Sequence, residues 1–255
     1  RTCQEYGKDM RMIASWIKSN SQVKRWRELT KADVDTMVQM WSSEGLQSAT
    51  IKRRVSTLRT FYQVARELGA NIENPAKYVS TPKGGKKVVN TIEMAAVAAA
   101  LNDPTNDAET KRAIAMMTET GMRLGEFLTV SLEDVDFAER RIRVHGKGNK
   151  ERYVYYGDAT AEQLRRMKAK QIAESCEREV RRKVHFALAK YDHGRQQSPH
   201  TLRHTFATQM LANGGELTVL SKLMGHEQIE TTKRYLEVSD VRAAAQYRQF
   251  GVKIG

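Results

Sequence analysis

The chain has 255 residues, with 43 Lys and Arg against 30 Asp and Glu, a formal net charge of +13 and a pI of about 9.8. This length can bury one large or two smaller hydrophobic cores, and the positive charge favours a polyanionic partner, with nucleic acid first. An anionic membrane is the weaker alternative, because the sequence has no long apolar span, lipidation motif or signal peptide. Cys3 and Cys176 are typical of thiols in a reducing compartment, so we expect a cytoplasmic protein.

The N-terminal part predicts three helices. Thr2 with Glu5 and Thr30 with Asp33 have the spacing of capping boxes, which mark the starts of the first two helices. The third begins at Ser48, and apolar residues recur at helical spacing in all three segments. We therefore predict a small helical domain at residues 1–75.

One side of the third predicted helix is strongly basic. No acidic residue interrupts this side before Glu67, whereas a solvated helix face normally mixes both signs, so we interpret it as a phosphate-binding surface. Residues 1–90 hold 17 Lys and Arg against 8 Asp and Glu, whereas residues 91–255 hold 26 against 22. The N-terminal third is thus the more strongly charged part. The basic residues of the helix are Lys52, Arg53, Arg54, Arg59 and Arg66.

The helical pattern ends in a stretch that predicts a flexible basic linker. Residues 76–91 and the Asn-Pro pair before them contain two prolines, a Gly pair and four lysines. Such a linker could cross DNA and let two domains close around the duplex. Its candidate phosphate contacts are Lys83, Lys86 and Lys87.

Residues 92–255 predict a second domain that is mainly helical. Helices are expected at about 92–101 and 107–120, then a short helix that begins at Arg123, and one or two charged helices within 158–191. Alternating residues on either side of the turn at 146–150 predict a β-hairpin. Its Gly-Lys-Gly turn is not a P-loop, because the following Lys-Ser or Lys-Thr is absent. The expected class is α+β, mainly α with a small β-hairpin or sheet.

A predicted helix near the C-terminal end carries several residues that could take part in binding or catalysis. Ser198 is a good N-cap and Pro199 a good first helical residue. His200, Arg203 and His204 then share one face, at a helix terminus that suits a phosphate. Zinc binding is a weaker interpretation, because no Glu follows the first His and an Arg lies between the two. A capped helix with satisfied core histidines is the purely structural alternative.

The combination with two later motifs resembles the tyrosine recombinase (phage integrase) family. Its C-terminal signature is an H-x-x-R pair, a Gly-His and a nucleophilic Tyr, which stand here as His200 with Arg203, Gly225-His226, and Tyr235. The resemblance covers nearly the whole chain. It implies an N-terminal helical SAM-like core-binding domain and a C-terminal catalytic domain with a tail helix.

Two further residues match the family pattern. Arg123 stands in the T-G-x-R-x-x-E setting of the first catalytic Arg, which Glu126 would support. The hairpin of the family carries a catalytic lysine, for which Lys147 is the matching position and Lys150 the runner-up. The chain departs from the family between 158 and 191, where the family has a longer passage with an extra apolar strand.

The resemblance implies metal-independent cleavage of a phosphodiester. Tyr235 would attack the phosphorus and form a 3′-phosphotyrosine link, while Arg123 and Arg203 neutralise the phosphate oxygens. The remaining implied roles are general base for His200, hydrogen-bond donor to the phosphate for His226, and proton donor to the leaving oxygen for Lys147. No cofactor and no metal ion are expected.

The implied function is site-specific DNA recombination, by integration, excision or resolution. The implied partners are double-stranded DNA with a specific site and further copies of the chain, in a tetrameric synaptic complex at the nucleoid. A tail helix at 239–255 would dock on a neighbouring protomer. A type IB topoisomerase uses the same chemistry and is one alternative. A DNA-binding module without catalysis is the other.

Overall fold

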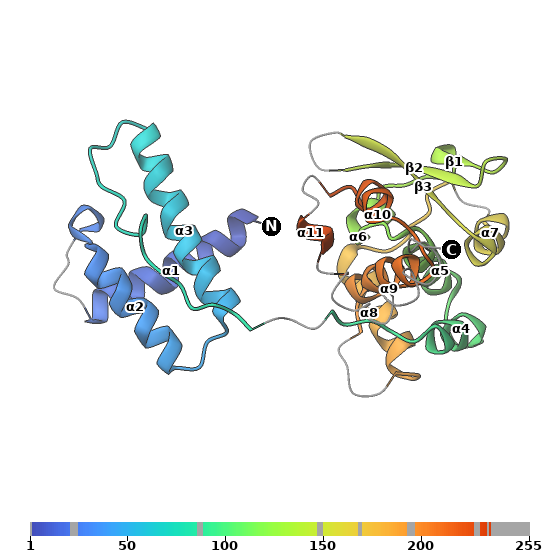
Figure 1. Ribbon diagram of the computed structural model, residues 1–255, viewed down its shortest axis with the longest axis horizontal. Helices are drawn as coiled ribbons and strands as arrows, with labels where there is room; N and C mark the ends of the chain where they lie inside the picture. The colour runs from blue at the N-terminus through green and yellow to red at the C-terminus, as the bar shows by residue number, and fades with distance from the viewer. Residues whose placement is uncertain are drawn as a thin grey trace, which may run out of the picture. The chain divides into compact units, whose positions relative to one another are not determined.

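A computed structural model describes residues 2–20, 25–85, 89–146, 150–167, 170–192, 197–226, 230–233 and 235. Its contacts divide the chain into two compact units, Arg1–Lys87 and Val88–Gly255 (Figure 1). The finer division into domains at 1–75 and 92–255 with a linker between them stays a prediction. The predicted tail helix at 239–255 lies outside the described residues.

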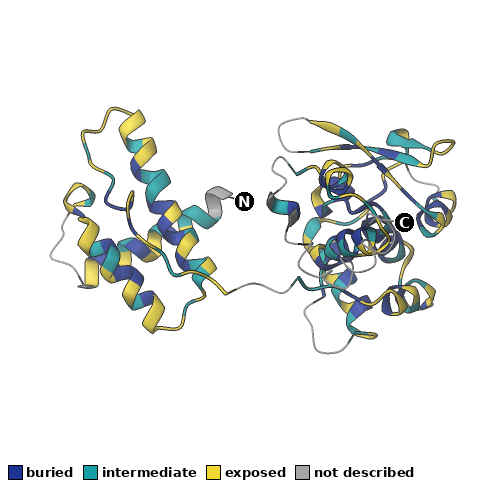
Figure 2. Cartoon of the chain, in the orientation of Figure 1, coloured by how far each residue is buried: buried dark blue, intermediate teal, exposed yellow. Residues whose placement is uncertain are grey.

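The first unit is helical, as predicted. It contains α1 (Thr2–Asn20), the 3-10 turn η1 (Trp26–Glu28), α2 (Lys31–Ser43) and α3 (Ser48–Glu67). The expected capping box of α2 is present, because the Thr30 side chain accepts from the Asp33 amide and the Asp33 carboxylate accepts from the Thr30 amide. Buried residues follow the inward sides of the three helices (Figure 2). The core they form includes Ile13, Trp41, Ile51, Val55, Leu58 and Tyr62.

The second unit is an α+β fold, as predicted. Its helices are α4 (Met94–Asn102), α5 (Ala108–Thr120), α6 (Leu124–Phe127), α7 (Asp158–Arg165), α8 (Glu177–Ala189), α9 (Pro199–Ala212), α10 (Leu217–Met224) and α11 (Glu230–Lys233), with a 3-10 turn η2 (Leu132–Asp134). Its strands are β1 (Val135–Asp136), β2 (Arg141–His145) and β3 (Glu151–Tyr155). Among the described residues no helix is long and apolar enough to cross a bilayer.

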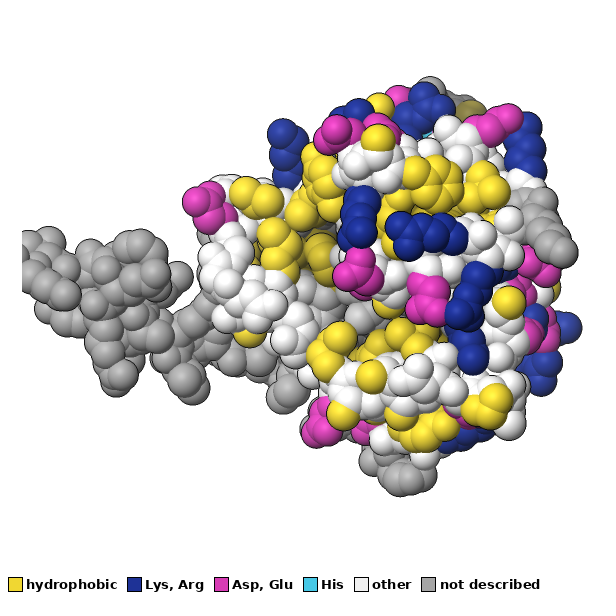
Figure 3. Space-filling view, turned by 90° about the vertical axis from the view of Figure 1, so that its right-hand side faces the viewer, with side chains coloured by type: hydrophobic (Ala, Val, Ile, Leu, Met, Phe, Trp, Pro, Cys, Tyr) yellow, Lys and Arg dark blue, Asp and Glu magenta, His cyan; other side chains and the backbone are white. Residues whose placement is uncertain are grey.

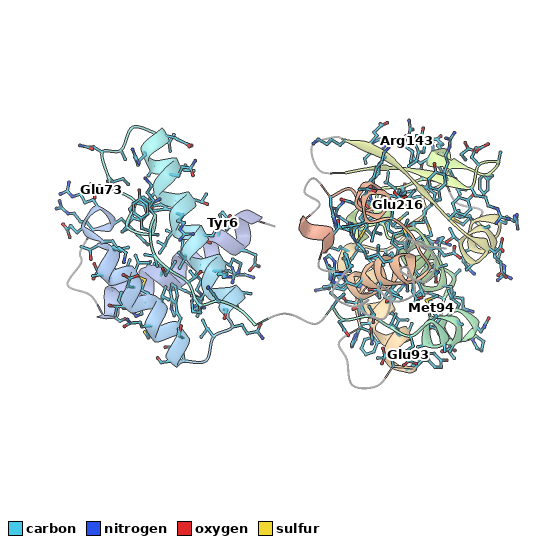
Figure 4. The ribbon with its side chains drawn as sticks, in the orientation of Figure 1. Tyr6, Glu73, Glu93, Met94, Arg143 and Glu216 are labelled. Atoms are coloured by element: carbon cyan, nitrogen blue, oxygen red, sulfur yellow. The ribbon has the colours of Figure 1, made fainter. Side chains whose placement is uncertain are left out.

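The predicted hairpin is present and belongs to a three-stranded antiparallel sheet in the order β1-β2-β3. Ile142 pairs with Val154 on β3 and with Val135 on β1. Strand β1 was not predicted, because two residues are too few to show an alternating pattern. Arg143, which is labelled in Figure 4, donates to Asp134 at 3.2 Å and ties β2 to η2.

Helix α5 is the centre of the second unit, where it packs against α4, α7, α8 and α9 (Figure 1). Its buried residues lie on all sides, which is typical of a helix enclosed by its neighbours. On the face of the second unit that Figure 3 shows, Lys and Arg side chains lie among acidic and hydrophobic ones rather than in one basic patch. This distribution agrees with the smaller excess of positive charge in residues 91–255.

Two glycines in the left-handed conformation follow the helices that lead into the Arg123 and Gly-His motifs. Gly121 (φ 64°) follows α5 and Gly225 (φ 61°) follows α10. A Cβ at Gly121 would lie 2.2 Å from the Phe206 ring, so the backbone and the packing both require glycine there. Helix α9 begins as predicted, with Ser198 accepting from the Thr201 amide and Pro199 as its first residue.

Candidate active site

Arg203 is a buried cation at the middle of the candidate site. Its side chain comes from α9, and the residue is only 4% exposed. One terminal nitrogen, Nη2, donates to the Met224 carbonyl at 2.6 Å and to His226 Nε2 at 3.2 Å, and Nη1 donates to the Gly121 carbonyl. Burial and the nearby Arg123 charge lower the pKa of Arg203 to about 10, so the group stays protonated at neutral pH.

Arg123 contacts the C-terminal end of α10, which Arg203 also contacts. It is the N-cap residue of α6, and its Nη2 donates to the Gly225 carbonyl at 3.0 Å. Its Nη1 donates to Glu126 Oε1 at 2.9 Å, and its amide donates to Glu126 Oε2 at 2.7 Å. The predicted support of Arg123 by Glu126 is therefore present as two hydrogen bonds. The guanidinium groups of Arg123 and Arg203 both contact the end of α10.

Arg152 was missed by the sequence analysis and is the second partner of Glu126. Its Nη1 and Nη2 donate to the two carboxylate oxygens of Glu126, each at 2.8 Å, and its Nε donates to the Leu223 carbonyl at 2.7 Å. Burial alone would raise the pKa of Glu126, but the hydrogen bonds and charges of Arg152 and Arg123 hold it below its ordinary value. Arg152 and the buried Val154 lie two residues apart on β3 and therefore on the same face of the strand. This alternation could have predicted that the Arg152 side chain points inward.

His226 is held between Arg203 and Thr232. Because a guanidinium has only donors, His226 Nε2 is the acceptor of the Arg203 bond, and Nδ1 carries the hydrogen. That Nδ1–H group donates to Thr232 Oγ1 at 2.8 Å. The Thr232 carbonyl in turn accepts from the Tyr235 amide at 3.0 Å. Thr232 thus connects His226 to the backbone of Tyr235.

The phenol of Tyr235 is buried against α9. The residue is 2% exposed and packs in a cluster with Ala207, Leu211 and Leu220. Its hydroxyl lies 2.8 Å from Nδ1 of His204, and the two rings are 5.6 Å apart between centroids. The rings of His204 and His200 stack at 6.1 Å with 26° between their planes. The described hydrogen bond of the phenol therefore involves His204, whereas the resemblance assigned the base role to His200.

The catalytic lysine is the site residue that the structure does not place. Lys147 lies outside the described residues. Lys150 is described, is exposed, and accepts from the Gly146 amide through its carbonyl at 2.8 Å across the hairpin turn. The choice between Lys147 and Lys150 stays a prediction.

The described residues offer no metal centre: they contain no group of three or more His, Cys, Asp and Glu side chains placed to hold an ion. The zinc interpretation would need a third ligand beside His200 and His204. Nδ1 of His204 is instead engaged with the Tyr235 hydroxyl.

Phosphate binding by the basic side of α3 stays a prediction, and the side chains on this side differ in exposure and in partners. Arg54 is 6% exposed and lies over the Trp41 ring at 5.0 Å, because the helix turns this position toward α2. Arg53 forms an ion pair with the buried Asp9, and Arg59 donates to the Ala76 and Val79 carbonyls at 2.8 Å each.

Of the other predicted phosphate contacts in the first unit, Lys52 and Lys83 are exposed. Lys86 and Lys87 lie outside the described residues.

Both units match families of known proteins. Residues 87–242 match the phage integrase family, and residues 1–69 match the phage integrase N-terminal SAM-like domain. Tyrosine recombinase XerC of Halalkalibacterium halodurans is 31% identical, over 97% of this chain and 90% of its own length. XerC of Lactobacillus leichmannii is 29% identical, over 98% and 92%, and XerD of Oceanobacillus iheyensis is 26% identical, over 98% and 91%.

Solved structures share the fold at lower identity. XerH recombinase bound to palindromic difH substrate, in a post-cleavage complex, superposes with a TM-score of 0.77 at 17% identity, over 96% of this chain and 79% of that one. A lambda integrase dimer bound to a COC′ core site superposes with a TM-score of 0.71 at 16% identity, over 91% and 86%. The match to the family model spans well over half of the sequence. The chain therefore belongs to the phage integrase family of tyrosine recombinases.

Proposed function

We propose that this recombinase cuts and rejoins DNA strands at a specific site through a 3′-phosphotyrosine intermediate on Tyr235. The observation that carries the proposal is the convergence of Arg123 and Arg203 on the end of α10, beside the buried Tyr235 hydroxyl. Within the described residues, Glu126 forms salt bridges with Arg123 and Arg152, and none joins a carboxylate to Arg203. A phosphate group would supply the missing anion.

The proposed chemistry needs only groups of the protein. The two guanidinium groups neutralise the non-bridging oxygens and stabilise the charge of the pentavalent transition state. The Tyr235 oxygen attacks the phosphorus, the bond to the 5′ oxygen breaks, and Lys147, or Lys150, gives that oxygen a proton. Religation reverses these steps, because the phosphotyrosine link conserves the energy of the phosphodiester.

The role of His226 follows from its tautomer. Nε2 can donate to a phosphate oxygen when it carries a hydrogen. Thr232 Oγ1 accommodates this change, because its hydroxyl can donate to Nδ1 as well as accept from it. His226 thus turns from an acceptor of the Arg203 bond into a phosphate donor when substrate binds.

The partners that we propose are double-stranded DNA and further copies of the chain. XerH recombinase is bound to difH substrate in its structure, and lambda integrase is bound to its core site as a dimer. We extend this to a tetrameric synaptic complex in which the tail at 239–255 docks on a neighbour. Lys52 and Lys83 are proposed as exposed phosphate contacts of the first unit.

The substitution Tyr235→Phe tests the nucleophile. It removes the hydroxyl and leaves the packed ring, so DNA affinity and thermal stability should stay as in the wild type, while covalent protein–DNA adduct on a nicked suicide substrate should disappear. The matched control is Tyr155→Phe, which removes the hydroxyl of a tyrosine that is 56% exposed on β3. An adduct that persists in Tyr235→Phe would refute the assignment. Relaxation of any supercoiled plasmid without sequence preference would refute site specificity.

A further inference from the structure

Arg152 contacts both groups that orient the Arg123 side chain. The Arg123 guanidinium has two described acceptors, Glu126 Oε1 for Nη1 at 2.9 Å and the Gly225 carbonyl for Nη2 at 3.0 Å. The Arg123 side chain is 39% exposed, so its direction depends on these hydrogen bonds more than on close packing. The position of the two acceptors therefore decides where the Arg123 charge points.

The first connection runs through the Glu126 carboxylate. Its Oε1 atom accepts from Nη1 of both arginines, at 2.9 Å from Arg123 and 2.8 Å from Arg152. Its Oε2 atom accepts from Nη2 of Arg152, also at 2.8 Å. A bidentate pair of this kind fixes the plane of a carboxylate as well as its distance. Arg152 thus determines where Oε1 lies for Arg123.

The second connection runs through the end of α10, against which β3 packs (Figure 1). Nε of Arg152 donates to the Leu223 carbonyl at 2.7 Å. A Cβ at Gly225 would lie 3.1 Å from Nη1 and 3.2 Å from Cζ and Nε of Arg152, so the guanidinium lies against the Gly225 backbone. Glycine permits this close approach. Arg152 therefore supports the segment whose carbonyl accepts from Arg123.

We infer that Arg152 is a positioning residue for Arg123, which holds the Arg123 guanidinium in the direction that a scissile phosphate requires. This inference rests on the proposed function and deepens it. The Arg152 side chain is 13% exposed and acts through Glu126 and Gly225. Arg123 is the residue that contacts the phosphate, and β3 contributes to its orientation through Arg152.

The role needs the planar fork of an arginine. Nη1, Nη2 and Nε of Arg152 lie in one plane and reach acceptors on α6 and α10 together. A lysine keeps the positive charge beside Glu126, but its ammonium is a compact group on a flexible stem that lacks this fixed geometry. Arg152→Lys therefore removes orientation while it keeps charge. Misplacement of a catalytic group by about 1 Å can lower a rate by about 10²-fold.

The test compares cleavage of a charged and a neutral scissile group. One nicked suicide substrate carries the natural phosphate. The other carries a methylphosphonate, in which a methyl group replaces one non-bridging oxygen and removes the negative charge. A guanidinium that neutralises this charge is needed for the phosphate and loses most of its importance for the methylphosphonate. The two methylphosphonate stereoisomers are used separately, and the isomer that best restores Arg123→Ala identifies the oxygen that Arg123 faces.

The measurement is the single-turnover rate of adduct formation by the full chain at saturating substrate. Arg152→Lys should cleave the phosphate about 10- to 10²-fold more slowly than the wild type. On the methylphosphonate isomer that restores Arg123→Ala, its rate should come within about threefold of the wild type. The double variant Arg123→Ala with Arg152→Lys should be no slower than Arg123→Ala alone, because Arg152 acts through Arg123.

The matched control is Arg143→Lys, the same substitution on the neighbouring strand β2. The Arg143 side chain is 43% exposed and forms an ion pair with Asp134 at 3.2 Å. Its rates on both substrates should equal those of the wild type. Partial unfolding of any variant lowers both rates by the same factor, so the ratio of the two rates separates positioning from lost stability.

Each outcome decides the inference. A loss in Arg152→Lys that is confined to the phosphate, with no added loss in the double variant, supports it. An equal loss on both substrates, no loss, or a further loss in the double variant overturns it. If circular dichroism shows that Arg152→Lys is unfolded, Arg152→Gln replaces it under the same criteria. Full activity of Arg123→Ala on the phosphate would instead refute the phosphate role of Arg123 in the proposed function, and the inference would fall with it.

Discussion

The substitution Arg152→Ala should destabilise the second unit strongly, because it breaks a buried ion pair from one side. Glu126 is 4% exposed, and two of the four described hydrogen bonds to its carboxylate come from Arg152. The substitution leaves the carboxylate in place with only the Arg123 bonds, and it also frees the Leu223 carbonyl at the end of α10. Removing one partner of a buried pair typically costs about 3–5 kcal/mol.

Urea unfolding can measure this loss with an internal reference. All three tryptophans, Trp16, Trp26 and Trp41, lie in the first unit, so tryptophan fluorescence follows that unit while far-UV circular dichroism follows both. With an m-value of about 2 kcal/mol/M, the midpoint of the second unit should fall by about 2 M. The fluorescence transition should not move.

The matched control is Arg166→Ala. Arg166 forms an i,i+4 pair with Glu162 on α7, in which the two side chains are 67% and 57% exposed. Exposed pairs of this kind contribute about 0.3–0.5 kcal/mol, so this variant should unfold almost as the wild type does. Equal stability of Arg152→Ala and Arg166→Ala would refute the reasoning that Arg152 holds the site together.

The same pair sets a pH dependence. The folded-state pKa of Glu126 lies below its ordinary value, because the two arginines outweigh the effect of burial. A depressed carboxyl pKa contributes stability above the unfolded value, near 4.3, and loses it as the pH falls through the folded value. The difference in unfolding free energy between wild type and Arg152→Ala should therefore be full at pH 7 and smaller in acid. A difference that grows in acid would contradict this assignment.

Two further predictions concern single positions. Arg54→Ala should lower the unfolding free energy of the first unit by about 1–3 kcal/mol, measured by tryptophan fluorescence, because it removes a buried side chain from the Trp41 ring. Lys52→Ala should leave that free energy unchanged and reduce the salt slope of DNA binding by about one. The opposite pattern would contradict the assignment of Arg54 as a packing residue and Lys52 as a phosphate contact. Gly121→Ala should lower the melting temperature more than Gly214→Ala, since both have positive φ but only Gly121 has Phe206 within contact; equal losses would show that the Phe206 contact is relieved without cost.

What the sequence predicted well was local. The start of α2 at Thr30, the start of α9 at Ser198 and the glycine after α5 follow from hydrogen bonds and backbone angles within one turn of chain. The same locality explains why Arg123 was expected at the start of a short helix. Residue order within a turn is enough to determine such features.

What the sequence could not predict depends on partners far along the chain. Lys52 and Arg54 look equivalent in the sequence. Arg54 is buried because Trp41 on α2 and Met12 on α1 contact its side chain. His200 and His204 share one helix face, so the choice between them depends on where Tyr235 lies. Periodicity assigns a residue to a face but does not name what packs against it.

Arg203 shows how the fold prepares the site before substrate arrives. A buried cation is unfavourable unless it is compensated. Here the described partners are His226 Nε2 and the carbonyls of Gly121 and Met224, which lie at the negatively polarised ends of α5 and α10. Burial and the neighbouring Arg123 charge nevertheless lower the pKa of Arg203 to about 10, so the site still disfavours the charge. Under the proposed function, a phosphate in the site would complete the compensation, and it would do so most strongly in the transition state, where its oxygens carry the most negative charge. The proposed function therefore predicts that the Arg203 charge stabilises the bound substrate more than it stabilises the free protein.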